Sequence, residues 1–436
     1  MAQKKQNGSI IAIITMMFLF AMISFVTNLA APIGVIWKNQ PGIEGSNFLG
    51  MMGNMMNFLA YLFMGIPAGK LLTKIGYKKT ALLAIAVGLL GVFTQYLSGI
   101  LGVGTQLFGL PANFFVYLLG AFIAGFSVCM LNTVVNPMLN LLGGGGNKGN
   151  QLIQIGGTCN SLTGTLTPMF VGALIGGVTK DTAITDVNMV LFIAMAVFAV
   201  AFIILSMVPI SDPDADKKKD NIVYERSPWA FRHFVLGTIA IFVYVGVEIG
   251  IPGTLNFFLE DANAGNVGAT VAGFVTGTYW FMMLIGRFLG SMVGAKVSSK
   301  AMLTFASTLG IILIVGAMVS PVTLKSSMPV FTGSGFALEQ VSLSALLLVL
   351  CGLCTSIMWG GIFNLATEGL GKYTAAGSGI FMMMVVGGGI LPLIQNWVAD
   401  MSTYMISYLV PIAGMAYMLY YALIGSKNVN KDISVD

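Results

Sequence analysis

Twelve apolar runs, each roughly 20 residues or longer, dominate this 436-residue sequence and limit what it can fold into. A run of this length crosses a hydrocarbon core of about 30 Å as an α-helix. Because a backbone in lipid must satisfy its own hydrogen bonds, helices are the expected structure for such runs. The predicted spans are 9–36, 48–72, 80–101, 112–142, 150–177, 187–208, 229–259, 267–295, 299–320, 341–368, 374–399 and 404–426.

Composition places this chain in lipid rather than in water. Only 8% of its residues are charged and 56% are hydrophobic, whereas a soluble domain is about a quarter charged. The first run follows Lys4 and Lys5 and continues to Trp37, which is too long for the roughly 7–15 apolar residues of a secretory signal. We therefore expect an all-α membrane protein of twelve transmembrane helices.

The distribution of positive charge predicts the orientation of the spans. All but three of the 21 Lys and Arg residues fall on the side of the N-terminus, and the exceptions are Lys38, Lys180 and Lys325. Because cytoplasmic loops carry the excess of Lys and Arg, both termini are predicted to be cytoplasmic. The same bias explains the net charge of +5, so we expect no nucleic-acid partner.

The chain divides into two halves that repeat. A charged cytoplasmic linker, 211–228, separates six spans in 1–210 from six in 229–436. A shift of about 220 residues superimposes matching features in chain order, as expected of an internal repeat. The matches are Asn28 and Pro32 with Glu248 and Pro252, Gly69 and Lys79 with Gly290 and Lys300, Asn140 with Asn364, and Gly164 and Pro168 with Gly388 and Pro392.

Repeated six-span halves are expected of transporters that rock one half against the other around a midplane site. On this interpretation the cytoplasmic loops at the same place in each half close the inner side. The gating residues predicted in these loops are Gly69, Lys79, Gly290, Lys300 and Arg287.

Glu248 is the acidic residue predicted to lie well inside a span. A charge at the membrane centre costs about 2.5–3.5 kcal/mol, so Glu248 must be neutral, paired or facing water. Pro252 lacks an N–H and therefore frees the carbonyl of Glu248, as Pro32 frees that of Asn28. We expect a broken helix at both places and a coupling-ion or substrate role for Glu248. The alternative is a protonated Glu248 that hydrogen-bonds between helices.

Most other polar residues in the spans are amides, accompanied by tryptophans. Amides donate and accept hydrogen bonds, and aromatic faces stack on C–H surfaces, which together suit a neutral polyol such as a sugar. Fixed cations are predicted to be missing from the span centres, which argues against an anionic cargo. Each amide could equally bond one helix to another. The substrate-binding candidates are Asn28, Asn57, Asn132, Asn136, Asn160, Asn256, Trp280, Trp359, Asn364, Gln395 and Asn396.

The sequence does not predict an enzyme, a metal site or a cofactor. Its single histidine, His233, starts a span, and the four cysteines fall in apolar runs without further ligands nearby. A small-molecule substrate and the lipid bilayer are the expected partners, and we expect a monomer.

Four segments resemble the fucose and glucose/galactose proton symporters of the major facilitator superfamily. The segments are "IFVYVGVEIGIPG" with Tyr244, Gly246 and Glu248, "SIMWGGIFNLATEGLGKYTAAGSG", "GGGILPLIQNWVAD", and "NTVVNP" with "CNSL". The resemblance implies the major-facilitator fold of two pseudo-symmetric six-helix halves. It also implies monosaccharide uptake across a bacterial inner membrane by alternating access, with Trp359 flanking the sugar.

The chain departs from this family at two acidic positions. Relatives carry Asn-Asp where this chain has Ala30-Ala31, and glutamate where it has Asn132; Gly157 replaces an expected glutamine. In relatives those acids bind sugar and carry the coupling proton. We therefore expect a secondary transporter for glucose, galactose, mannose, fucose or a similar sugar, coupled to a proton or sodium if at all. The alternatives are a channel or sensor with a carrier fold, or a carrier of another polar solute without ion coupling.

Overall fold

The computed structural model describes most of the chain and places it in two compact units, Met1–Lys218 and Lys219–Asp436. The described ranges are 2–142, 146–175, 182–208, 226–294, 297–332, 335–370, 373–430 and residue 433. The predicted linker 211–228 lies almost entirely outside them, so its boundaries remain a prediction.

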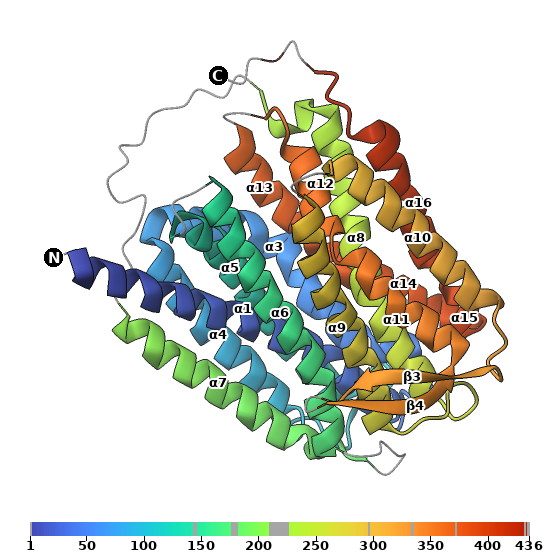
Figure 1. Cartoon of the computed structure of the whole chain (residues 1–436). Helices are drawn as coiled ribbons and strands as arrows, with labels where there is room; N and C mark the ends of the chain where they lie inside the picture. The colour runs from blue at the N-terminus through green and yellow to red at the C-terminus, as the bar shows by residue number, and fades with distance from the viewer. Residues whose placement is uncertain are drawn as a thin grey trace. The chain divides into compact units, whose positions relative to one another are not determined.

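The N-terminal unit is helical, with one very short hairpin (Figure 1). Its elements are α1 (Ala2–Lys38), α2 (Asn47–Gly50), α3 (Met52–Ile75), α4 (Tyr77–Leu97), β1 (Gln106–Leu107), β2 (Leu110–Pro111), α5 (Ala112–Leu142), α6 (Gly146–Ile175), the 3-10 turn η1 (Ile184–Val187) and α7 (Asn188–Met207).

The C-terminal unit repeats this order with more interruptions. Its elements are η2 (Pro228–Ala230), α8 (Arg232–Glu260), α9 (Ala269–Gly294), α10 (Ser299–Val319), β3 (Lys325–Phe331), β4 (Phe336–Ser342), α11 (Leu343–Thr355), α12 (Met358–Thr367), α13 (Thr374–Met383), η4 (Met384–Val386), α14 (Gly387–Met401), α15 (Tyr404–Ser407), α16 (Leu409–Tyr420) and the π-helical turn η5 (Tyr421–Gly425).

These helices confirm the twelve-helix architecture. Each predicted span coincides with one long helix or with consecutive shorter ones. Within the described ranges, eleven helical segments are long and apolar enough to cross a membrane. The twelfth, α6, is as long as the others, but its sequence "GGTCNSLTGTLTP" is rich in glycine and hydroxyl groups, which lowers its apolar character.

Corresponding helices pack in the same pairs in the two units. The first span packs on the fifth (α1 on α6, α8 on α14), and the second on the fourth (α3 on α5, α9 on α11). The third packs on the fourth (α4 on α5, α10 on α11) and on the sixth (α4 on α7, α10 on α16). The sequence repeat is therefore also a repeat of packing.

The prolines do not break the helices where breaks were expected. Pro32 lies inside the continuous α1 and Pro252 inside the continuous α8. Interruptions occur instead in the second span at Met51, in the tenth between α11 and α12, in the eleventh at η4 and in the twelfth at Tyr408. A single missing N–H can be tolerated in a spanning helix when a neighbouring side chain satisfies the freed carbonyl.

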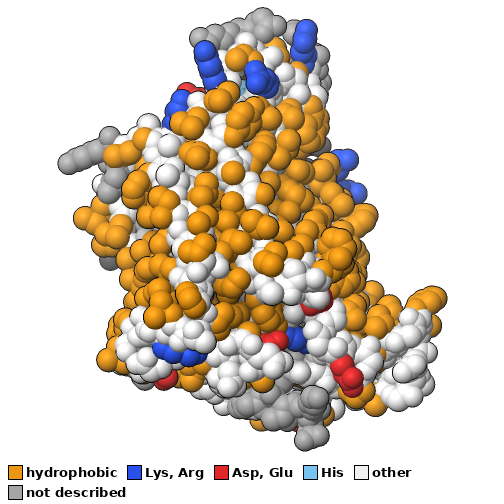
Figure 2. Space-filling view, turned by 90° about the vertical axis from the view of Figure 1, so that its right-hand side faces the viewer, with side chains coloured by type: hydrophobic (Ala, Val, Ile, Leu, Met, Phe, Trp, Pro, Cys, Tyr) orange, Lys and Arg blue, Asp and Glu red, His pale blue; other side chains and the backbone are white. Residues whose placement is uncertain are grey.

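The surface carries the apolar character that the composition predicts. On the face in Figure 2, hydrophobic side chains predominate and Lys and Arg side chains gather mainly toward its ends. Large exposed side chains such as Phe63, Ile203, Phe288 and Phe305 point outward from α3, α7, α9 and α10. Lipid is the solvent that fits this surface.

Candidate functional site

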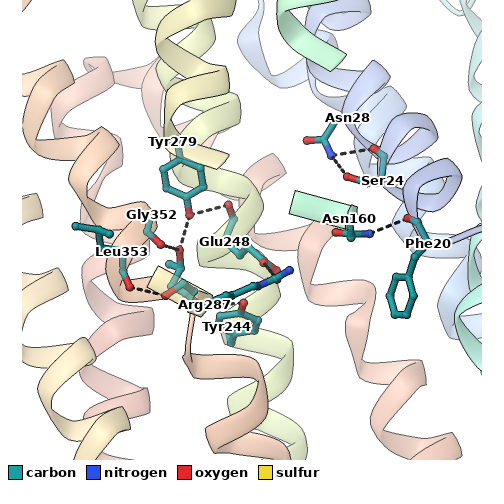
Figure 3. Close-up of polar contacts among 12 residues, drawn as sticks. Phe20, Ser24, Asn28, Asn160, Tyr244, Glu248, Tyr279, Arg287, Gly352 and Leu353 are labelled. Atoms are coloured by element: carbon teal, nitrogen blue, oxygen red, sulfur yellow. Dashed lines mark hydrogen bonds and ion pairs between the residues drawn. The ribbon is translucent and has the colours of Figure 1, made fainter. Parts of the chain in front are cut away.

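An ion pair inside the C-terminal unit forms the centre of the candidate site. The Arg287 Nη2 atom on α9 lies 3.7 Å from the Glu248 Oε1 atom on α8 (Figure 3). The exposed fractions of the two side chains are 18% and 12%, so the pair is largely buried but not sealed from water. Of the three states predicted for Glu248, the structure shows the paired one.

This pair corrects the prediction that Arg287 belongs to a cytoplasmic loop. Arg287 lies inside α9, seven residues before the helix ends at Gly294. Span centres were also predicted to lack fixed cations; Arg287 lies near the end of its apolar segment Ala269–Gly290, yet its side chain reaches Glu248. The apolar segment of α9 continues past Arg287 to Gly290, which places Arg287 in the helix rather than in the loop that follows it.

Tyr279 holds the backbone next to the acid. Its hydroxyl donates to the main-chain carbonyl of Glu248 at 3.1 Å, which is the carbonyl that Pro252 leaves without an amide donor. The same hydroxyl lies 2.9 Å from Thr355 Oγ1 on α11. Tyr279 therefore satisfies the freed carbonyl and links α8, α9 and α11 around Glu248 (Figure 3).

Tyr244 donates a hydrogen bond to a second carbonyl, at the interruption of the tenth span. Its hydroxyl donates to the Thr355 carbonyl at 3.1 Å, where α11 ends. Tyr244 is one turn before Glu248 on α8, and its hydroxyl also lies beside that carboxyl. Its ring packs edge-on against Trp359, with centroids 6.2 Å apart. The predicted sugar-flanking Trp359 is thus connected to Glu248 through Tyr244.

Close approach of α9 to α11 and to the two residues that follow it holds these groups together. A side chain at Gly286 would collide with Ser356, and one at Gly290 would collide with Ile357. Gly290 therefore lies in a packed helix rather than in the predicted gating loop. Trp280 is 6% exposed and packs edge-on against Tyr279 at 5.4 Å.

The equivalent position in the N-terminal unit is bonded within its own helix. Asn28 Nδ2 donates to the Ser24 carbonyl at 2.9 Å and lies 3.2 Å from Ser24 Oγ. Asn160 on α6 donates from Nδ2 to the Phe20 carbonyl of α1 at 3.2 Å, which links the two helices (Figure 3).

Three further amides of the N-terminal unit lie on α3 and α5. Asn132 Nδ2 donates to the Tyr61 hydroxyl at 2.7 Å, and Asn136 Nδ2 donates to the Asn132 carbonyl at 3.0 Å. Asn57 is buried, and its Oδ1 atom has no partner among the described residues. Asn132, the position where the family resemblance implies an acid, here bonds to a phenol.

The remaining candidates of the C-terminal unit separate into three kinds. The Asn256 amide donates to Glu260 Oε1 of its own helix and accepts from Thr276 Oγ1 of α9, so it links α8 to α9. Gln395 and Asn396 are buried on α14, and within the described ranges Gln395 Nε2 and Asn396 Oδ1 have no partner. Asn364 is exposed on α12, away from these contacts.

A lysine near the start of the third span caps a helix end in each unit, but only one of the two is a predicted gating residue. Lys300, in the first turn of α10, donates from Nζ to the Leu423 carbonyl at 3.1 Å. In the N-terminal unit Lys78 does this, with bonds of 2.9 and 2.8 Å to the Ser206 and Val208 carbonyls, whereas the predicted Lys79 is exposed. Gly69 lies inside α3 and faces open space. These residues lie in helices rather than in loops, and a gating role remains a prediction.

Sequence reasoning did not assign Tyr244, Thr355 or Tyr61 to the site. The available signals were a tyrosine one turn before Glu248 and a hydroxyl directly before the interruption of the tenth span. Neither identifies a partner, because the partners lie on helices distant in sequence.

Comparison with known proteins places the chain in a family. A model of the Major Facilitator Superfamily matches residues 11–393. A glucose/galactose transporter of Brucella abortus is 33% identical over 384 residues, covering 85% of this chain and 84% of that protein. A putative glucose/galactose transporter of Helicobacter pylori is 30% identical over 444 residues, covering 98% of both. The L-fucose-proton symporter of Escherichia coli is 24% identical over 413 residues, covering 88% and 85%.

Solved structures show the same fold. The transporter FucP in its outward conformation matches with a TM-score of 0.64 at 19% identity, covering 94% of this chain and 98% of that one. A D-xylose-proton symporter matches with a TM-score of 0.69 at 12% identity, covering 96% and 98%.

Proposed function

Because the chain belongs to the major facilitator superfamily, we propose that it carries a neutral monosaccharide across a bacterial inner membrane by alternating access, together with a proton. The names of the relatives support the cargo: one is a glucose/galactose transporter, a second is named a putative glucose/galactose transporter, and a third is an L-fucose-proton symporter. The positive-inside distribution of Lys and Arg supports cytoplasmic termini.

The observation that carries the coupling proposal is the Glu248–Arg287 pair. Arginine keeps its charge in proteins, whereas a carboxylate can take up a proton. A proton on Glu248 removes the negative charge and with it the attraction between α8 and α9. The two protonation states of Glu248 therefore favour different contacts between these helices, and a difference of this kind couples a ligand to a conformational equilibrium.

The sugar contacts that we propose belong to the same unit as this pair. Trp359 supplies an aromatic face for sugar C–H groups. The buried Gln395 Nε2 and Asn396 Oδ1 atoms lack described protein partners. A buried polar atom without a partner is costly, so a sugar hydroxyl would satisfy it with a net gain. In the N-terminal unit Asn57 Oδ1 is the equivalent candidate.

Counterflow in proteoliposomes tests the cargo directly. Vesicles preloaded with unlabelled sugar would take up labelled glucose, galactose, mannose, fructose or fucose transiently. This exchange needs no coupling ion, so it does not depend on Glu248. Absence of counterflow for all five sugars, with folded protein, would overturn the monosaccharide proposal.

Glu248→Gln tests the coupling. We expect this variant to lose accumulation driven by a proton gradient and to keep counterflow, because the neutral amide mimics the protonated acid permanently. Glu260→Gln is the matched control, since Glu260 ends the same helix and bonds to Asn256. Unchanged proton-driven accumulation in Glu248→Gln would favour an uncoupled carrier or another coupling site.

A further inference from the structure

The Tyr244 hydroxyl lies between two hydrogen-bond acceptors that belong to different helices. It is 3.1 Å from the Thr355 carbonyl of α11, and it also contacts the Glu248 carboxyl one turn along α8 (Figure 3). A phenol has a single proton to donate, although its oxygen can also accept. Tyr244 can therefore donate to only one of these two groups at a time.

The protonation state of Glu248 decides which group receives the Tyr244 proton. An ionised carboxylate only accepts, and a hydrogen bond to it is roughly twice as strong as one between neutral groups. When Glu248 is ionised, Tyr244 therefore donates to the carboxylate. When Glu248 is protonated, the acid donates to the Tyr244 oxygen, and the Tyr244 proton is available to the Thr355 carbonyl.

The Thr355 carbonyl lies at the interruption of the tenth span. Thr355 is the last residue of α11, and α12 begins at Met358. The last carbonyls of a helix have no partner within it, so a bond from another helix helps to fix where the helix end lies. The hydrogen bond from Tyr244 therefore acts directly before Trp359, the second residue of α12.

The Trp359 ring is held by other aromatic rings. It packs edge-on against Tyr244 with centroids 6.2 Å apart, and against Phe381 of α13 with centroids 5.8 Å apart. Tyr244 is fully buried, whereas Trp359 keeps part of its surface exposed. A movement of the Tyr244 ring or of the α11 end therefore changes the direction of the exposed indole face.

Two residues of α9 also face Glu248. Arg287 keeps its charge in either state of the acid, and Tyr279 donates to the Glu248 main-chain carbonyl rather than to the carboxyl. The titratable residues of the other described elements packed against α8 are Cys351 and Cys354 of α11, Asp400 of α14, Tyr417 and Tyr420 of α16, and Tyr421 of η5. Tyr244 links the carboxyl itself to a main-chain group of the tenth span.

We propose that Tyr244 is a positioning residue, a relay that passes the protonation state of Glu248 to Trp359. A proton taken up by Glu248 from water turns the Tyr244 hydroxyl to the Thr355 carbonyl, which fixes the start of α12 and the Trp359 face. Loss of that proton turns the hydroxyl back to the carboxylate and releases the interruption. This inference rests on the proposed function, in which Glu248 is the coupling acid and Trp359 contacts the sugar.

The fluorescence of Trp359 tests the relay without any sugar. The signal is the difference in emission between the full chain in detergent and the same chain carrying Trp359→Phe, recorded from mildly acidic to mildly alkaline pH. We expect this signal to change with pH in the wild type and to stay constant in the Glu248→Gln background. In the Tyr244→Phe background the change should fall about fivefold or more, the lower end of the coupling typical of linked sites.

Tyr408→Phe is the matched control. Tyr408 is also fully buried, and its hydroxyl donates to another α8 carbonyl, that of Ile251, at 3.1 Å. This variant should keep the wild-type change, and gel filtration shows which variants are folded. A wild-type change in Tyr244→Phe would overturn the relay. A change that persists in Glu248→Gln would also overturn it, and this second comparison does not depend on the folding of Tyr244→Phe.

Counterflow separates a failure of the relay from a failure of the proposed function. Absence of counterflow in the wild type for all five sugars would overturn the sugar proposal but not the fluorescence result, because that measurement needs no sugar. A Trp359 signal that does not respond to pH in the wild type would overturn the relay even where counterflow is present.

Discussion

Each unit has a polar residue four positions before a proline, Asn28 in one and Glu248 in the other. The two side chains find their hydrogen-bond and charge partners in different ways. In α1, Asn28 bonds to Ser24 one turn earlier in the same helix. In α8, Glu248 is paired with Arg287 of another helix, and its carbonyl is bonded by Tyr279. A neutral amide can be satisfied locally, whereas a charge in a span requires a counter-charge from a neighbour. The proposed ion coupling therefore belongs to the C-terminal unit.

Removing one member of the ion pair should have the largest effect. Arg287→Gln leaves Glu248 buried without a counter-charge, which costs about 3–5 kcal/mol for a fully buried pair and less here because of partial exposure. We expect a large fall in the thermal unfolding temperature in detergent. The double variant Glu248→Gln with Arg287→Gln should recover most of the loss but not proton-driven accumulation. A double variant as unstable as the single one would contradict this interpretation.

Introducing an acid at the repeat-related position of the N-terminal unit is the second test. Asn28→Asp introduces a carboxyl where the described contacts include no arginine, at a cost of about 2.5–3.5 kcal/mol if it ionises. We expect lower expression and a lower unfolding temperature than for the isosteric control Asn28→Leu. Normal stability together with a new proton dependence of transport would show that the N-terminal unit can also accommodate the charge.

Removing the hydrogen bond from Tyr279 to the Glu248 carbonyl should have an intermediate effect on stability. Tyr279→Phe should destabilise the protein by about 0.5–1.5 kcal/mol, since the carbonyl loses its donor. In a Pro252→Ala background the alanine N–H can bond to that carbonyl, so Tyr279→Phe should cost less. A double-mutant cycle of unfolding temperatures measures this coupling, and strict additivity would contradict it.

The lysine caps should behave alike in the two units. Lys78→Met and Lys300→Met each remove a cation from helix-terminal carbonyls, with an expected loss of about 0.3–1 kcal/mol. Lys79→Met is the control and should leave the unfolding temperature unchanged, because the Lys79 side chain is exposed. An effect of Lys79→Met equal to that of Lys78→Met would indicate a different arrangement of this helix end.

Much of the fold and part of the site could be predicted from the sequence. The twelve spans, the family resemblance and the carbonyl freed by Pro252 follow from run length, motifs and the chemistry of proline. The hairpins were not predicted, although residues 325–342 contain the turn sequence "TGSG", and exposed and buried positions alternate along part of this segment. Most of this segment lies between the predicted spans 299–320 and 341–368, for which the length of the apolar runs is the signal used.

The sequence by itself determined that the chain spans a membrane as two repeated halves and that an acid in the seventh span needs an explanation. These properties depend on features within one run, namely its length, its charges and its proline. Only the tertiary structure decided that Arg287 pairs with Glu248 and that Lys78 rather than Lys79 caps α7. It also decided that Tyr279 donates to the Glu248 carbonyl and Tyr244 to the Thr355 carbonyl. These contacts depend on how each helix is rotated and how closely it packs, because neighbouring residues on a helix point in different directions.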